Sequence, residues 1–153
     1  PLLAAGGIGG GPAIAAVLTL GADGAWVGTR FAATREGVQS EAAKAAIVAA
    51  EAQDTVLTRV YDLAEGHPWP ARYPGRALRS AFTDRWHGRE AELEADPRAA
   101  AAEVGGLRES GVLVYAGQAS GVVHDVPPAG EVLARLAAGA ERALRERVPS
   151  LLA

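Results

Sequence analysis

Two short apolar runs that each end in glycine constrain the fold more than any other feature of this chain. The first run covers residues 2–5 and ends at Gly6-Gly7, and the second covers residues 24–27 and ends at Gly28-Thr29. Short continuous apolar runs that stop at turn residues are typical of buried strands in a parallel sheet. We therefore expect two buried strands near the start of the chain.

The stretch between these runs predicts a helix. Pro12 suits the first helical position, and a periodic apolar sequence follows it until Gly21. A strand, a helix and a second parallel strand form one right-handed βαβ unit. Residues 1–31 thus predict an α/β fold.

Glycine at both strand ends suits the binding of an anion. Backbone N–H groups with no side chain beside them can approach a ligand closely, and in (β/α)8 barrels a phosphate often lies after the seventh and eighth strands. We expect Ala5, Gly6, Gly7, Gly28 and Thr29 to surround a phosphate group. Tight turns that bind nothing are the alternative, because glycine turns often serve backbone geometry alone.

Composition narrows the classes of function. A net charge of −3 and a pI near 5.6 give no basic surface for nucleic acid or an anionic membrane. The chain has no cysteine, and its histidines, His67, His87 and His124, lie far apart without further ligands at metal-binding spacing. We therefore expect no metal site, no nucleic-acid partner and no membrane partner, and we expect a cytoplasmic protein that acts on a small molecule.

Four segments carry a resemblance to a known family. AAGGI at residues 4–8 and LGADGAWVGTRFAATRE at residues 20–36 resemble the last two barrel strands of the nitronate monooxygenases, formerly called 2-nitropropane dioxygenases. WHGREAEL at residues 86–93 and VYAGQASGVV at residues 114–123 resemble the C-terminal segment of that family. The resemblance covers the whole chain.

The resemblance implies an FMN-dependent TIM (β/α)8 barrel that oxidises alkyl nitronates with O2 and without a metal. It also implies that the catalytic histidine lies upstream, so we expect no catalytic residue in this chain. The family more often has a polar residue and Asp-Gly where this chain has Gly9, Gly10 and Gly11, so the following helix loses a side-chain N-cap.

The length fits only part of such a barrel. A complete (β/α)8 barrel needs about 250 residues, whereas this chain has 153 residues, no methionine and one readable βαβ unit. We expect the C-terminal portion of a longer protein, with the last two barrel strands and a mostly helical C-terminal extension. The expected divisions are residues 1–53 for the last two βα units, 54–111 for an insert of loop and helices, and 112–153 for a closing strand-loop and a helix that packs back on the barrel.

Sequence patterns predict the remaining elements. Apolar residues at helical spacing, among them Val38, Ala42 and Ala45, predict a helix over residues 36–53 with these side chains buried. We expect further helices over residues 76–95, from Pro97 to Gly105-Gly106, and over 129–147, and extended segments over 55–61 and 112–115. The proline-rich stretch from 66 to 76 should be a loop.

Several side chains have both a functional and a structural interpretation. Arg30 either neutralises the phosphate or points outward into an ion pair. Trp69 and Tyr73 either line a substrate or flavin-edge pocket or anchor their loop, and His87 is more often structural than a base in such a setting. Gln118 lies among small residues, and the resemblance favours a position near the flavin.

Three alternatives to the monooxygenase remain at this point. The chain could belong to an FMN-dependent enoyl reductase or to a relative of inosine monophosphate dehydrogenase, since both have phosphate-binding barrels. The long insert with WHGRE favours the monooxygenase over these two. A non-catalytic barrel fragment is the third alternative, and it predicts weak FMN retention.

Overall fold

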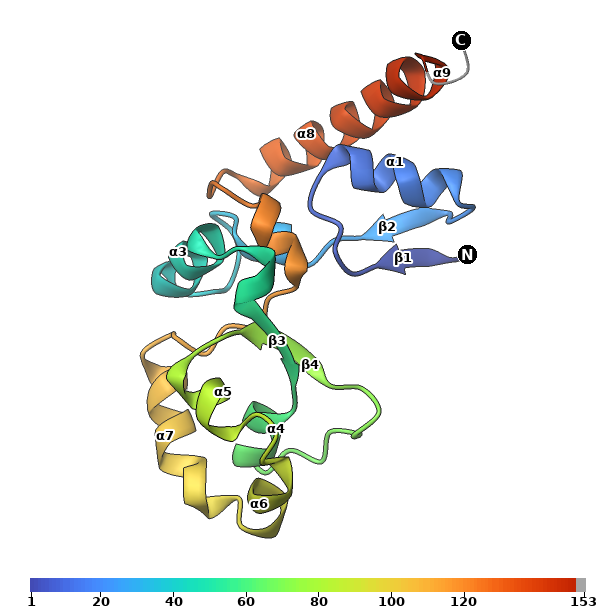
Figure 1. Cartoon of the computed structure of the whole chain (residues 1–153). Helices are drawn as coiled ribbons and strands as arrows, with labels where there is room; N and C mark the ends of the chain where they lie inside the picture. Colours follow the sequence, from blue (N-terminus) through green and yellow to red (C-terminus); the bar gives the residue numbers. More distant parts are fainter. Residues whose placement is uncertain (151–153) are drawn as a thin grey trace.

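The structure is a computed structural model that describes residues 1–150 as two small sheets surrounded by helices. Figure 1 shows β1, β2, α1 and α8 together at one end and a separate group of helices around β3 and β4 at the other. The elements in chain order are β1 (Leu3–Ala5), α1 (Gly11–Thr19), β2 (Gly24–Trp26), α2 (Thr29–Ala32), α3 (Glu41–Ala49), η1 (Ala52–Asp54), β3 (Thr55–Thr58), α4 (Val60–Ala64), β4 (Gly75–Leu78), α5 (Ala81–Trp86), α6 (Glu90–Ala95), α7 (Arg98–Glu109), η2 (Gln118–Val122), α8 (Ala129–Arg142), η3 (Ala143–Arg147) and α9 (Val148–Ser150).

The expected strand, helix and parallel strand are present at the start of the chain. Strands β1 and β2 pair in parallel, with Leu3 opposite Gly24 and Ala5 opposite Trp26. Helix α1 ends at Thr19, and Gly21 continues the chain at a φ of 100°, which only glycine adopts readily. The α/β interpretation of this segment is confirmed.

The two strands are more exposed than the sequence predicts. Leu3 is 51% exposed and Trp26 is 67% exposed, and residues 1–150 form no closed barrel. The sheet has only two strands, and α1 covers one of its faces (Figure 1). An apolar run indicates a strand that suits burial, but burial itself depends on neighbouring elements.

Helix α3 is shorter than expected and buries a different face. It begins after Ser40, whose side-chain oxygen accepts a hydrogen bond from the Ala43 amide at 3.1 Å. This N-cap fixes the start of the helix, so the predicted start at residue 36 was wrong. Ala43, Lys44 and Ile47 are buried, whereas Val38 is fully exposed in the preceding loop.

The segment after α3 contains a hairpin that the sequence did not reveal. Strand β3 pairs antiparallel with β4, with Val56 opposite Ala77, so the helix predicted from residue 76 was wrong at its start. The rest of that predicted helix is divided into α5 and α6 at Gly88, which has a φ of 86°. Helices α4 to α7 enclose a core made chiefly of Val60, Tyr61, Phe82, Trp86, Leu93, Ala100 and Val104.

The chain then returns to the first sheet region. Helix α7 continues past Gly105-Gly106 to Glu109, and the Val114 carbonyl accepts from the Leu78 amide at 2.9 Å. The chain before the excursion over residues 54–111 meets the chain after it at Ala52 and Gly121, because a Cβ added to Gly121 would lie 2.9 Å from the Ala52 nitrogen. Residues 54–111 lie between these two neighbouring points.

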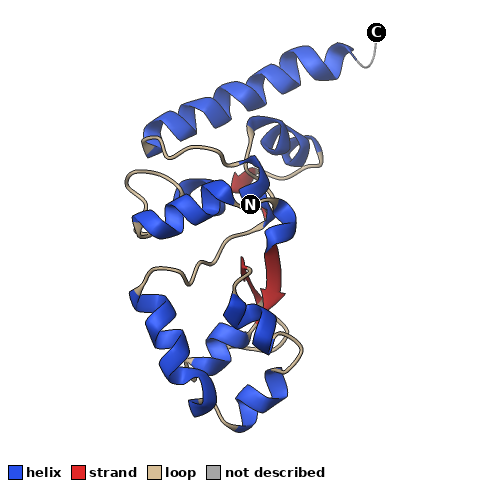
Figure 2. Cartoon of the chain, turned by 60° about the vertical axis from the view of Figure 1, so that its left-hand side comes forward, coloured by secondary structure: helices blue, strands red, loops and turns tan. Residues whose placement is uncertain are grey.

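Helix α8 packs back on α1, as expected. It continues into η3 and α9, so the predicted helix over 129–147 is confirmed as one long helical segment (Figure 2). A Cβ added to Gly11 would lie 2.4 Å from the Gly139 carbonyl carbon, so the two helices cross with their backbones almost in contact. No helix among residues 1–150 is both long and apolar enough to cross a membrane.

Candidate functional site

The two glycine corners lie side by side at one edge of the first sheet. Ala5 is opposite Trp26 in the parallel register, so Gly6-Gly7 and Gly28 leave the sheet from the same ends of adjacent strands. The short loop at Gly6-Gly7 has φ values of 93° and 70°, in the left-handed region that favours glycine. The arrangement brings together the residues that the sequence predicts for an anion site.

Both corners are open. A Cβ added to Gly6, Gly7 or Gly28 would meet no atom within 4 Å. Among the turn, loop and cap hydrogen bonds of residues 1–150, none has the backbone amide of Gly6, Gly7 or Gly28 as its donor. The corners thus combine available donors with space for a ligand, which is the combination that anion binding through the backbone requires.

Two of the three glycines that follow the first corner, Gly9 and Gly11, serve packing instead. A Cβ on Gly9 would lie 2.5 Å from Val122 Cγ2, and Gly11 lies against Gly139. Gly10 is the N-cap of α1 and makes no side-chain cap, as the sequence indicates. The loop from Gly9 to Gly11 is therefore closely packed between α8 and η2.

Gln118 is held near the second corner by a backbone contact of its neighbour Gly117. The amide of its neighbour Gly117 donates to Thr29 Oγ1 at 2.8 Å, although the two residues are 88 positions apart. Gln118 itself is exposed and begins the 3-10 helix η2. The structure thus brings the Gln118 turn, defined here as residues 117–125, to the same region as Thr29.

The buried side chain of Arg30 forms an ion pair with the half-exposed Asp125. Its side chain is 7% exposed, and Nη1 lies 2.9 Å from Asp125 Oδ1 while Nη2 donates to the Asp125 carbonyl at 2.9 Å. The second sequence interpretation, an ion pair, is the observed one, but the arginine points inward. Sequence analysis missed Asp125, because nothing local marks a partner 95 residues away.

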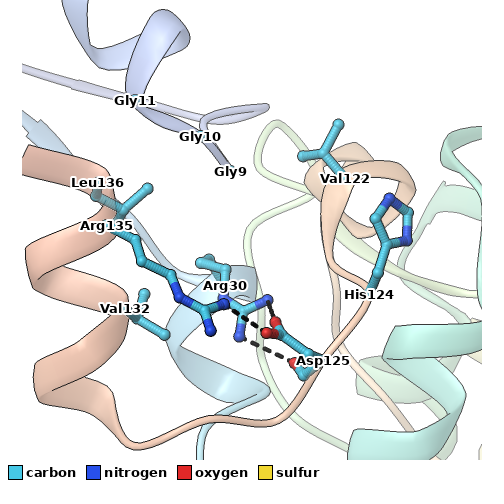
Figure 3. A pocket seen from close by; sticks show the side chains of 10 residues that line it. All are labelled: Gly9, Gly10, Gly11, Arg30, Val122, His124, Asp125, Val132, Arg135 and Leu136. Carbon is cyan, nitrogen blue, oxygen red and sulfur yellow. Dashed lines mark hydrogen bonds and ion pairs between the residues drawn. The ribbon is translucent and has the colours of Figure 1, made fainter. Parts of the chain in front are cut away.

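A cavity of about 330 Å³ lies beside this ion pair (Figure 3). Asp125 also pairs with Arg135 of α8 at 2.5 Å, and the hydrogen bond from Arg135 and the charge of Arg30 lower the pKa of the Asp125 carboxyl. Opposite charges thus compensate one another in this cavity. Its lining residues are Gly9, Gly10, Gly11, Arg30, Val122, His124, Asp125, Val132, Arg135 and Leu136.

The other candidate residues lie away from the corners. His87 is an exposed residue after α5, 3.4 Å from the Glu90 carboxylate, and His67 lies 3.1 Å from Glu65. Trp69 and Tyr73 are exposed on their loop, where the Trp69 indole donates to the Tyr73 carbonyl. Residues 1–150 bring no group of three or more metal-ligating side chains together.

Relatives of this chain include two proteins named as nitronate monooxygenases. It is 35% identical over 143 residues to the nitronate monooxygenase npaC of Metarhizium robertsii, covering 87% of this chain and 39% of that protein. It is 28% identical over 150 residues to a nitronate monooxygenase of Neurospora crassa, covering 95% of this chain and again 39% of the relative. The chain therefore spans well under half the length of these relatives.

Solved enzyme structures are also similar to this chain. FabK from Thermotoga maritima superposes with a TM-score of 0.74 at 29% identity, over 98% of this chain and 47% of FabK. The nitroalkane oxidase from Streptomyces ansochromogenes superposes with a TM-score of 0.69 at 34% identity, over 94% of this chain and 40% of that enzyme. The sequence model of the nitronate monooxygenase family matches residues 1–139. With that match over most of its length, the chain belongs to the nitronate monooxygenase family.

Proposed function

We propose that this chain forms the FMN phosphate site of an oxidoreductase that oxidises alkyl nitronates with O2. Its membership of the nitronate monooxygenase family supports the reaction class. The open pair of glycine corners supports the cofactor, because a phosphate needs several hydrogen-bond donors at close range. The chain would act as the C-terminal portion of the enzyme.

The observation that carries the proposal is the missing side chain at Gly28, which neither the backbone nor the packing requires. Its φ of −97° and ψ of −73° are available to any residue, so the backbone does not require glycine. Its Cβ position is empty, so packing among residues 1–150 does not require glycine either. A ligand that approaches the backbone at this point would explain the missing side chain.

The residues present fit a phosphate held without a metal. We assign the backbone amides of Gly6, Gly7 and Gly28 as donors, together with the amide and hydroxyl of Thr29. Arg30 supplies no free charge, because Asp125 already compensates it. The amides and the hydroxyl would therefore carry the binding, as in other backbone anion sites.

The flavin ring would lie towards the remaining site residues. Ala5 ends β1 beside the first corner, and Gln118 would face the flavin from its turn. When bound, FMN would supply the redox chemistry of the oxidation, while the residues of this chain would bind and orient it. We assign no catalytic role to His67, His87 or His124, and we place the catalytic histidine upstream.

The proposal includes the division of the chain. Residues 1–53 would supply the last two βα units of the barrel, residues 54–111 an insert, and residues 112–153 the closing segment. The side chains of Leu3 and Trp26 are exposed on one face of the sheet, and the filled interior of a barrel would cover such a face. The competing interpretation is a non-catalytic fragment, for which a purified chain would remain colourless.

Substitution of Gly28 tests the phosphate site. Because the Cβ position is empty and φ is negative, Gly28→Ala should leave the fold intact but crowd the phosphate. We expect FMN affinity, measured by quenching of flavin fluorescence, to fall by at least about tenfold through the loss of a charge-assisted hydrogen bond.

Gly105→Ala is the matched control, since Gly105 also has an empty Cβ position but lies on α7. It should leave FMN affinity unchanged. Equal affinity in Gly28→Ala and the unaltered protein would contradict the proposed site. Failure of the unaltered protein to retain FMN would favour the non-catalytic fragment.

A further inference from the structure

Two segments far apart in the chain run alongside each other and are joined at four points. Residues 29–36 follow the second glycine corner, and residues 117–129 contain the Gln118 turn and the start of α8. The four contacts are Gly117 amide to Thr29 Oγ1, Arg30 to Asp125, Arg35 amide to the Pro127 carbonyl at 3.1 Å, and Ala129 amide to Glu36 Oε2 at 2.8 Å. The partners follow the same order along both segments. We call residues 29–36 and 117–129, joined in this way, the clamp.

Thr29 uses only part of its hydroxyl in this clamp. Its oxygen accepts the Gly117 amide at 2.8 Å, and a hydroxyl can accept and donate at the same time. Within residues 1–150 the Thr29 hydroxyl donates to no acceptor. Its proton is therefore available to a ligand at the adjacent Gly28 corner.

Arg30 holds the other end of the Gln118 turn. Its two terminal nitrogens bind both the carboxylate and the carbonyl of Asp125, and Nη2 also donates to the Ala33 carbonyl at 3.2 Å. Consecutive residues of α2 thus hold Gly117 and Asp125, the first and last residues of the turn. Gln118 cannot move far from the corner while both contacts persist.

We propose that Thr29 and Arg30 are positioning residues that couple occupancy of the glycine corners to the order of the Gln118 turn. The inference rests on the proposed phosphate site. A bound phosphate accepts the Thr29 O–H, which fixes the hydroxyl and strengthens its oxygen as the acceptor for Gly117, since linked hydrogen bonds reinforce one another. Arg30 keeps the far end of the turn in place, so that the change at Gly117 orders Gln118.

Hydrogen–deuterium exchange of residues 117–125, with and without FMN, measures this coupling. In the unaltered protein FMN should slow exchange at the amides of Gly117, Ser120 and Val123, which donate within the turn or to Thr29. Thr29→Ser keeps the hydroxyl and should preserve the response. Thr29→Val has nearly the same shape without the hydroxyl, so Gly117 should exchange about three- to tenfold faster before FMN is added, with no slowing afterwards.

Arg30→Lys and Arg135→Gln distinguish the ion pair of the buried arginine from that of the exposed arginine. Both arginines bind Asp125, but Arg135 is 55% exposed and lies outside the clamp. Arg30→Lys cannot bind the carboxylate and the carbonyl together, so exchange of residues 117–125 should rise. Arg135→Gln should leave the exchange and its response to FMN unchanged.

The outcomes distinguish this inference from the proposed function. If Thr29→Val binds FMN and shows the same slowing at Gly117 as the unaltered protein, the coupling is wrong while the phosphate site stands. A response to Arg135→Gln as large as that to Arg30→Lys would also overturn the positioning role. If the unaltered protein shows no binding of FMN, the phosphate site and the coupling to it both fail.

Discussion

Gly11 of α1 and Gly139 of α8 lie in direct contact, with Gly139 Cα 2.5 Å from the position that a Gly11 Cβ would occupy. Neither φ lies in the left-handed region, so the glycines are required by the approach of the two helices. Small residues at such a crossing allow backbones to pack more closely than side chains would permit. This contact fixes α8 to the βαβ unit that carries the glycine corners.

Gly11→Ala should destabilise the chain by separating these helices. Overpacking a tight contact typically costs about 1–3 kcal/mol, and backbone atoms cannot turn aside as a side chain would. Urea unfolding monitored by circular dichroism measures the loss. Gly10→Ala is the control, because its Cβ would meet only Pro12 Cδ at 3.8 Å, and equal stability of the two variants would contradict the role of the crossing.

Glu36 makes the start of α8 sensitive to acid. Its carboxylate accepts from the Ala129 amide at 2.8 Å, in place of the cap that Pro128 lacks, and this hydrogen bond lowers the pKa of Glu36. A lowered pKa in the folded state stabilises the fold above the ordinary value of 4.5, and this contribution is lost as pH falls through the folded pKa.

We expect Glu36→Gln to be slightly less stable than the unaltered chain near neutral pH. The difference between the two should shrink as the solution is acidified below 4.5. Thermal unfolding at several pH values checks this. A constant difference across the range would mean that the charge of Glu36 does not contribute.

Tyr115 should make the stability of the fold sensitive to alkaline pH. Burial raises the pKa of its phenol, and the negative charge of Asp62, whose Oδ1 accepts from the phenol at 3.1 Å, raises it further. A raised pKa means that the folded state keeps the proton after the unfolded chain has released it. The associated stability is present below the ordinary value of 10.0 and is lost as pH rises above it.

Tyr115→Phe should therefore unfold at a higher pH than the unaltered chain in an alkaline titration. Ultraviolet absorbance of the phenolate measures ionisation, and circular dichroism measures unfolding in the same samples. Tyr73→Phe is the control, because Tyr73 is exposed on its loop. If both variants shift the midpoint equally, the contact between Tyr115 and Asp62 is not responsible.

Local sequence patterns predicted the parts of the fold that depend on local interactions. The βαβ order follows from glycines and proline beside periodic apolar residues, and α8 follows from its apolar stripe. The same reasoning failed at β4, where Arg76 and Ala77 have no strong preference and pairing with β3 decides the conformation. It also failed for burial of β1 and β2, because burial depends on neighbouring strands.

The glycine corners of the candidate site could be predicted from the sequence, but the contacts that Thr29 and Arg30 make beside them could not. Glycine has few roles besides positive φ and close approach, so Gly6, Gly7 and Gly28 were identifiable from their positions at strand ends. The supporting contacts of Thr29 and Arg30 join residues 88 to 95 positions apart. Such pairs leave no periodic signal, and an arginine after a threonine is compatible with many partners.

The close approach of Ala52 and Gly121 brings together the chain before and after the excursion over residues 54–111. A shorter connection could replace part of this excursion without moving either position, as long as Gly117 and Gln118 remain, since Gly117 binds Thr29 beside the second corner. The glycine corners would keep their surroundings in such a shortened protein. Helices α4 to α7 can thus be enlarged, reduced or replaced by design while the two glycine corners are retained.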